Sequence, residues 1–104
     1  MIRAILNGTT LEIQGHAGSA PYGQDLVCAG VSALVYALAQ RLTELDHQGA
    51  FEEMPRITLS SGSAQISVLA TRKYQREVAE DFHLIHSGLM LLQNHYPQCI
   101  AVDE

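Results

Sequence analysis

His16 and Cys28, separated by a run of small residues, are the two side chains in this sequence best suited to covalent chemistry. An imidazole beside a thiol can take its proton, and the resulting thiolate is a nucleophile. His16 follows a strand-like segment, and Cys28 lies near the start of a helix-like one. The pair predicts nucleophilic catalysis if the fold brings the two side chains together.

The predicted helix that carries the thiol gives Cys28 a favourable position. Asp25 is a suitable N-cap because its carboxylate can accept a backbone N–H of the first turn. Cys28 then stands near the third helical residue, where free N–H groups favour a thiolate and can hold an oxyanion. Ser32 lies one turn further on the same face, so its hydroxyl can approach the thiol. Whether Asp25 is only a cap or also orients His16 stays open.

The connection between the two candidate groups is rich in residues that form turns. Gly15, Gly18, Tyr22 and Gly23 belong to it, and we expect it to act as a substrate loop that closes over a bound peptide. The alternative is an ordinary surface connection. Tyr22 suits either contact with substrate or anchoring of the loop.

The rest of the pattern predicts how these groups are held. Strands are expected over residues 2–7, 11–14, 56–60 and 65–70, and helices over residues 25–48 and 74–95. Asn7-Gly8 and Ser61-Gly62-Ser63 are expected to form hairpin turns. The order ββαββα predicts an α+β fold: one compact domain over residues 1–104. We expect a largely antiparallel four-stranded sheet with two amphipathic helices on one face.

The amino-acid composition argues against some classes of function and of binding partner. The formal net charge of −5 argues against direct binding of nucleic acid and leaves a basic peptide as a plausible partner. There is no recognisable signal peptide, and no uninterrupted apolar run reaches the ~20 residues that cross a bilayer. We therefore expect a cytoplasmic protein without membrane contact, in which Cys28 and Cys99 are reduced thiols.

Other candidates are weaker. His83 and His86 are three residues apart, but no further ligand pattern completes a metal site, so we expect neither metal nor cofactor. Cys99 is interpreted as structural or incidental. Without a Cys-x-x-Cys motif a redox role for Cys28 is disfavoured. A non-catalytic binding module with a buried structural Cys28 remains the main alternative to an enzyme.

The region around both candidate groups resembles a known family. The matching residues are Gly15-His16-Ala17, Gly23, Asp25, Val27-Cys28-Ala29 and Val31-Ser32-Ala33-Leu34. They resemble the ribosomal-processing cysteine protease family Prp, also called YsxB-like, and the likeness extends over essentially the whole length.

The resemblance implies a bacterial cytoplasmic endopeptidase that works as a homodimer. It implies removal of the N-terminal extension of large-subunit ribosomal protein twenty-seven, with a mobile loop between the catalytic residues. Cys28 then corresponds to the nucleophile and His16 to the base. Asp25 and Ser32 occupy the positions of the family's other invariant polar residues.

Overall fold

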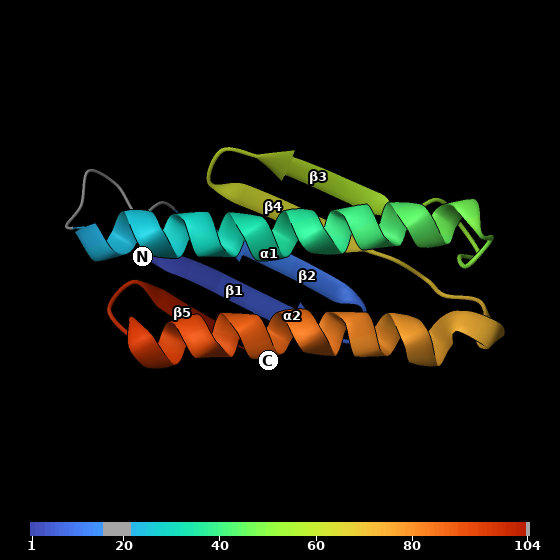
Figure 1. Cartoon of the computed structure of the whole chain (residues 1–104). Helices are drawn as coiled ribbons and strands as arrows, with labels where there is room; N and C mark the ends of the chain where they lie inside the picture. Colours follow the sequence, from blue (N-terminus) through green and yellow to red (C-terminus); the bar gives the residue numbers. More distant parts are fainter. Residues whose placement is uncertain (16–21, 104) are drawn as a thin grey trace.

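The structure is a computed structural model that describes residues 1–15 and 22–103, with only the backbone described for residues 22–25. It has two layers, a sheet and a pair of helices (Figure 1). The α+β class is confirmed. In chain order the elements are β1 (Ile2–Asn7), β2 (Thr10–Gln14), α1 (Tyr22–His47), β3 (Arg56–Ser60), β4 (Ser63–Ser67), the short 3₁₀ helix η1 (Arg72–Tyr74), α2 (Gln75–His95) and β5 (Ile100–Asp103).

The sheet has five strands rather than the predicted four, in the order β3-β4-β2-β1-β5. The additional strand, β5, follows α2 and pairs parallel with β1, with Ile2 opposite Ile100. The other three pairings are antiparallel, as expected. The prediction of a sheet without β5 was therefore wrong, and the sheet is mixed.

Both helices lie on one face of the sheet, as predicted (Figure 1). The connection from β2 through α1 to β3 passes over β4, and the connection from β4 through α2 to β5 passes over β2 and β1. The two crossovers run in opposite directions across the sheet and start from antiparallel strands. Because such crossovers are almost always right-handed, both place their helix on the same side.

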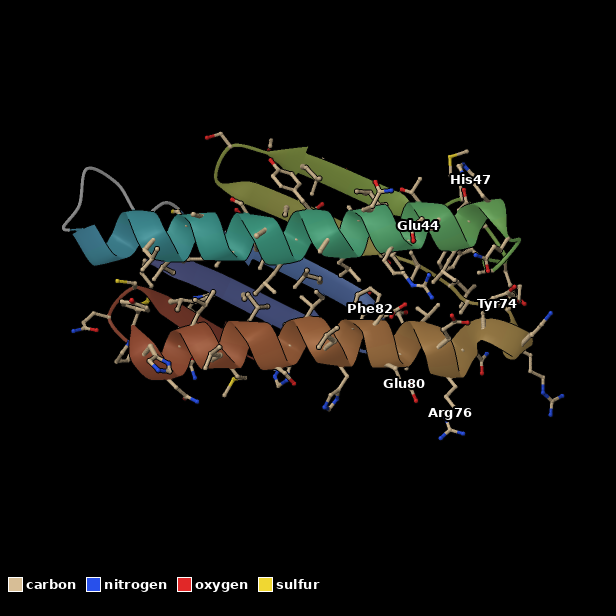
Figure 2. All side chains as sticks on the ribbon, in the orientation of Figure 1. Glu44, His47, Tyr74, Arg76, Glu80 and Phe82 are labelled. Carbon is tan, nitrogen blue, oxygen red and sulfur yellow. The ribbon has the colours of Figure 1, made fainter. Side chains whose placement is uncertain are left out.

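The core lies between the helices and the covered face of the sheet. Alternate residues of β1, β2 and β4 point into it, and one stripe of each helix meets them. Phe82 of α2 is 2% exposed and points toward the interior, whereas the exposed pair Arg76 and Glu80 points away (Figure 2). The buried apolar residues are Ile2, Ala4 and Leu6 of β1, Leu11 and Ile13 of β2, Ala64 and Ile66 of β4, Val27, Val31, Val35, Leu38, Leu42 and Leu45 of α1, and Val78, Phe82, Ile85 and Leu89 of α2, among others.

Two glycines allow the antiparallel helices to approach each other closely. A Cβ at Gly88 of α2 would lie 2.8 Å from Leu34 Cδ2 of α1, and a Cβ at Gly30 of α1 would lie 3.2 Å from Leu92 Cδ1 of α2. Each glycine therefore receives a leucine from the facing helix. This packing holds the first half of α1, which carries Cys28, in a fixed position beside α2.

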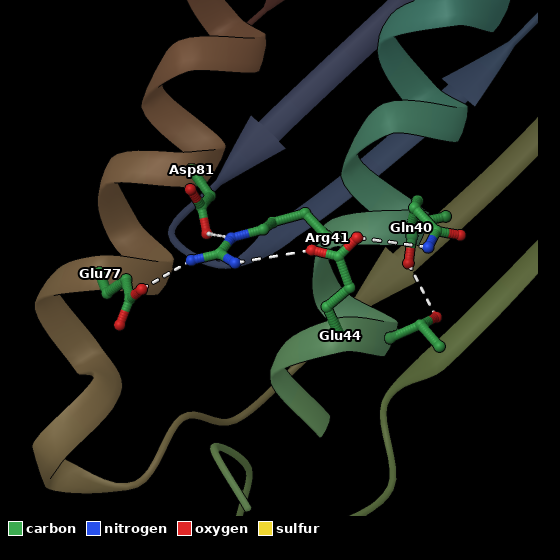
Figure 3. A network of polar contacts seen from close by, with 7 residues as sticks. Gln40, Arg41, Glu44, Glu77 and Asp81 are labelled. Atoms are coloured by element: carbon green, nitrogen blue, oxygen red, sulfur yellow. Dashed lines mark hydrogen bonds and ion pairs between the residues drawn. The ribbon is translucent and has the colours of Figure 1, made fainter. Parts of the chain in front are cut away.

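A charged network joins the other half of α1 to α2 (Figure 3). Arg41 Nη2 lies 2.6 Å from Glu77 Oε1, and its Nε lies 3.3 Å from Asp81 Oδ2. Glu44, one turn along α1, completes the cluster at 3.7 Å. Desolvation acts to lower the pKa of Arg41, but the three carboxylates outweigh it and raise the pKa above its usual value.

The turn predictions were correct in place but not in detail. Asn7 pairs with Thr10, so the β1–β2 turn consists of Gly8 and Thr9 rather than Asn7-Gly8. Gly8 has φ +61° whereas Thr9 does not have a positive φ, which is the pattern of a type II′ turn. In the second hairpin, β4 begins at Ser63, two residues earlier than predicted.

α1 is apolar enough to be compared with membrane helices. Its segment Leu26–His47 has the length and composition that could cross a membrane, with a mean hydropathy of 1.5. The sequence prediction had placed no such segment here, because Gly30 and Ser32 interrupt the apolar run. In the structure the apolar stripe of α1 packs on the sheet, so part of this hydropathy belongs to the core.

Candidate active site

A pocket of about 460 Å³ lies where the first half of α1 faces the β3–β4 hairpin. The ends of β1 and β2 close it, through Ile2, Ile13 and Gly15. Figure 1 shows the N-terminal half of α1 and the turn that joins β3 to β4, the two elements that supply most of the pocket lining, at the same end of the molecule. The pocket exists because α1 lies over the middle of the sheet and leaves β3 uncovered.

Five residues of α1 line the pocket, and three of them, Cys28, Ser32 and Tyr36, stand at successive turns; the other two are the buried Val31 and Val35. The spacing of four between Cys28, Ser32 and Tyr36 places these three on one side of the helix, next to the buried stripe. Cys28 is partly buried and packs against the core, while Ser32 and Tyr36 are exposed. The thiol of Cys28 is thus accessible from the pocket, unlike that of Cys99, which is buried in the core. A fully buried Cys28, which the binding-module alternative requires, is not observed.

The opposite wall comes from the β3–β4 hairpin. Leu59 supplies an apolar surface, and the turn Ser60–Ser63 supplies hydroxyl and backbone groups. None of the described residues that line the pocket carries a charge. A thiolate formed there gains no ion pair from these residues, so its formation needs a base from another part of the chain.

Gly15 connects this pocket to the candidate histidine. Its N–H donates to the Gly62 carbonyl at 3.0 Å, which joins the end of β2 to the hairpin turn. Gly15 has φ +114°, and a Cβ there would overlap the carbonyl oxygen of Met1, so only glycine fits. Gly15 therefore leads the chain out of β2 at the edge of the pocket. His16, the next residue, and Gly18 lie outside the described residues.

The start of α1 corrects three predictions. The helix begins at Tyr22, so Tyr22 and Gly23 belong to its first turn rather than to the loop. Asp25 is the fourth helical residue and not the N-cap. Pro21 in the sequence is a signal for this earlier start, since proline is common where helices begin. Gly23, which usually disfavours helix by about 1 kcal/mol, had pointed the other way.

This start also changes the expected chemistry of Cys28. Counting from Tyr22, Cys28 is the seventh helical residue, beyond the first four whose N–H groups lack helical partners. The expectation that these N–H groups stabilise the thiolate and the oxyanion at Cys28 was therefore wrong. The effect of the helix dipole also falls off within the first turn.

Sequence reasoning missed Tyr36 and the serine-rich turn Ser60–Ser63 as parts of the site. Tyr36 could have been found, because it continues the Cys28–Ser32 spacing by one more turn. The serine turn had only a local turn signal, and nothing in the sequence indicated that it faces α1.

The other candidate cluster gives no metal site. The rings of His83 and His86 lie 6.3 Å apart and are tilted by 54°. Both border a smaller hollow of about 230 Å³ near Phe82 and Gly8. In the part of the chain that the structure describes, no group of three or more histidine, cysteine or acidic residues could hold a metal ion.

Comparison with known families shows to which protein family this chain belongs. The family model for cysteine protease Prp matches residues 1–101. The chain belongs to the Prp family. It is therefore a cysteine protease, and the family resemblance drawn from residues 15–34 is confirmed. A search of curated proteins gives no match to this sequence.

Solved structures agree with this fold over nearly the whole chain. SMU.848 from Streptococcus mutans is 26% identical with a TM-score of 0.71, over 99% of this chain and 92% of that one. The ribosomal processing protease Prp from Staphylococcus aureus, bound to a substrate peptide, is 21% identical with a TM-score of 0.73. The same protease with a covalently linked product peptide is 22% identical with a TM-score of 0.70. Both of these cover 98% of this chain and 95% of the other.

Proposed function

We propose that this Prp-family protease is a bacterial cytoplasmic endopeptidase with Cys28 as nucleophile and His16 as general base. Its substrate is the N-terminal extension of large-subunit ribosomal protein twenty-seven. The observation that carries the proposal is the accessible thiol of Cys28 in the pocket between α1 and the β3–β4 hairpin. Gly15, which precedes His16, lines the same pocket.

The need for a base outside the described lining supports the choice of His16. No charged side chain among the described pocket residues can take a proton from the thiol. The start of α1 removes the free N–H groups of the helix terminus as the main activator of Cys28. A histidine attached directly to the pocket residue Gly15 supplies the missing function.

The reaction then follows from these two groups. His16 takes the thiol proton, and the Cys28 sulfur attacks the scissile carbonyl carbon to form a tetrahedral intermediate. The C–N bond breaks as the imidazolium gives its proton to the leaving amine, which leaves a thioester on Cys28. His16 next takes a proton from water, the hydroxide attacks the thioester, and the released thiolate is protonated again.

The choice of substrate rests on the family and on one related structure. The Staphylococcus aureus protein is described as an essential ribosomal processing protease and was solved with a substrate peptide. The resemblance of residues 15–34 to the same family implies the extension of ribosomal protein twenty-seven. An acidic protein with net charge −5 is also suited to meeting basic ribosomal proteins before they bind RNA.

The decisive test is a digest analysed by mass spectrometry. The wild type and Cys28→Ala are each incubated with a synthetic peptide that spans the N-terminal extension of the organism's own ribosomal protein twenty-seven. We expect one cut by the wild type and none by Cys28→Ala, Cys28→Ser or His16→Ala. Cys99→Ala is the matched control and should cut normally. Cutting by Cys28→Ala would refute the assignment of the nucleophile.

The proposal also includes a homodimer. Leu84 and Leu91 lie seven residues apart on α2 and are 69% and 57% exposed, so they form an unusual apolar ridge on the helix layer. We expect the double change Leu84→Glu and Leu91→Glu to give a monomer in sedimentation experiments. Gln65→Glu, on the open face of the sheet, is the control and should leave the dimer intact.

A further inference from the structure

β3 is an edge strand beside the pocket, and no described element covers its free side. It is the first strand in the order β3-β4-β2-β1-β5, and α1 does not extend over it (Figure 1). Four of its five side chains are exposed. Edge strands with free backbone groups readily pair with another extended chain.

The pairing pattern tells which backbone groups of β3 face outward. The N–H of Val68, just after β4, donates to the Thr9 carbonyl at 3.2 Å, and the Gly62 carbonyl, just before β4, accepts from Gly15. The backbone N–H and C=O groups of the even-numbered residues of β4 therefore point toward β2. Because backbone groups alternate in direction along an antiparallel strand, those of the odd-numbered residues of β4 point toward β3.

The register then identifies the free groups. The odd-numbered residues Ser63, Gln65 and Ser67 are opposite Ser60, Thr58 and Arg56, which use their backbone groups in this pairing. The residues between them, Ile57 and Leu59, have N–H and C=O groups that point away from β4, toward the open edge. Leu59 also lines the pocket that contains Cys28.

We propose that the substrate binds in an extended conformation as a further strand along β3, with its backbone hydrogen-bonded to Ile57 and Leu59. This inference rests on the proposed function and adds where and how the peptide is held. A strand added there sends alternate side chains toward the helix-covered face, which is the side where the pocket opens. Backbone pairing with β3 then gives affinity, and the pocket reads the side chains beside the scissile bond.

A peptide fits this edge better than a second copy of the chain. The edge is continuous with the wall of the nucleophile pocket through Leu59, Ser60 and Ser61. A second protein placed along β3 would cover this wall and exclude substrate from Cys28. An endopeptidase also has to hold its target as an unfolded segment, whose backbone groups need partners.

The test measures binding without cleavage. The Cys28→Ala protein is titrated with the ribosomal-extension peptide and with variants that each carry one backbone N-methyl group, at consecutive positions. A methyl group removes one N–H donor. We expect an alternating pattern along the bound segment, in which every second methyl weakens binding by about tenfold and those between by less than about twofold. A pattern without alternation, or no binding of the unmodified peptide, overturns the inference.

A matched pair of protein variants tests the same edge from the other side. Leu59→Pro removes the outward N–H without touching the β3–β4 pairing, and Leu59→Ala removes the same side chain but keeps the N–H. Both are made in the Cys28→Ala background. We expect the Kd of the peptide for Leu59→Pro to exceed that for Leu59→Ala by about fivefold to tenfold, with equal urea midpoints.

Two further controls test the direction of the β3 backbone groups and the self-association of the chain. Thr58→Pro should unfold the hairpin, because its N–H faces β4. Unfolding of Leu59→Pro to the same degree would overturn the assigned direction of the backbone groups. A loss of self-association in Leu59→Pro, with the same Kd as Leu59→Ala, would assign the edge to a second copy. Alternating binding without any cleavage by the wild type would refute the protease assignment while supporting the edge site.

Discussion

Replacing Gly15 by alanine tests how tightly the fold controls the approach to the pocket. At φ +114° an alanine is strained by about 1–3 kcal/mol. Its Cβ would also overlap the Met1 carbonyl oxygen, and moving backbone to relieve this adds about 1–3 kcal/mol. The lower flexibility of the unfolded alanine chain offsets about 0.4–1 kcal/mol. We expect a net loss of about 3 kcal/mol in the free energy of unfolding, and a Tm lower by about 14 °C.

Gly8→Ala is the matched control for this prediction. Gly8 also has positive φ, at +61°, but a Cβ there meets nothing within 4 Å. Alanine at position 8 therefore costs only backbone strain of about 1–2 kcal/mol. The lower flexibility of the unfolded chain offsets part of this cost, as it does at position 15. Urea denaturation of both variants, with the slope m compared, measures the difference.

Activity should separate the two variants further. At a temperature where both are folded, Gly15→Ala should lose up to about 100-fold in kcat/KM, because the chain that leads to His16 is displaced. Gly8→Ala should keep wild-type activity. Equal stability and equal activity of the two variants would refute the claim that the contact between Gly15 and Met1 positions the site.

Two further predictions concern the charged network and the pocket wall. Arg41→Ala should lower the urea midpoint more at low salt than at high salt, because it removes one ion pair within α1 and two that join α1 to α2. Arg76→Ala breaks one exposed pair within α2 and should change the midpoint little; equal effects of the two variants would contradict the network's role. Tyr36→Ala should raise KM by about fivefold with kcat nearly unchanged, because Tyr36 lines the pocket. Since Tyr36 is 60% exposed, the free energy of unfolding should change by less than about 0.5 kcal/mol. A fall in kcat at constant KM would exclude this role in binding.

Local signals account for what the sequence predicted well. α1 and α2 are amphipathic as predicted, each with a buried apolar stripe, and α2 ends at His95 as predicted. Gly49, with φ +78°, lies just after the end of α1, as a C-terminal glycine should. These features depend on residues a few positions apart, so one segment at a time is enough to find them.

The missed features depend on distant parts of the chain. β5 has only four residues, and what makes it a strand is its parallel pairing with β1 at the other end of the sequence. The start of α1 was misplaced because Asp25 is a good cap in isolation, while the real helix extends one turn further. The pocket itself joins residues 28–36 to residues 59–64, a contact that no local pattern encodes.

The pairing of β2 with β4 has a consequence for how the enzyme gains activity as it folds. Thr10 pairs with Ser67, so this contact closes a loop that contains all of α1 and β3. The β3–β4 hairpin and the helices are local and can form within microseconds, but long-range strand pairing is slow. The two walls of the pocket meet only when the hairpin docks on β2. In a refolding experiment, recovery of the catalytic pocket should therefore follow the slowest phase of sheet assembly and lag behind the helical signal.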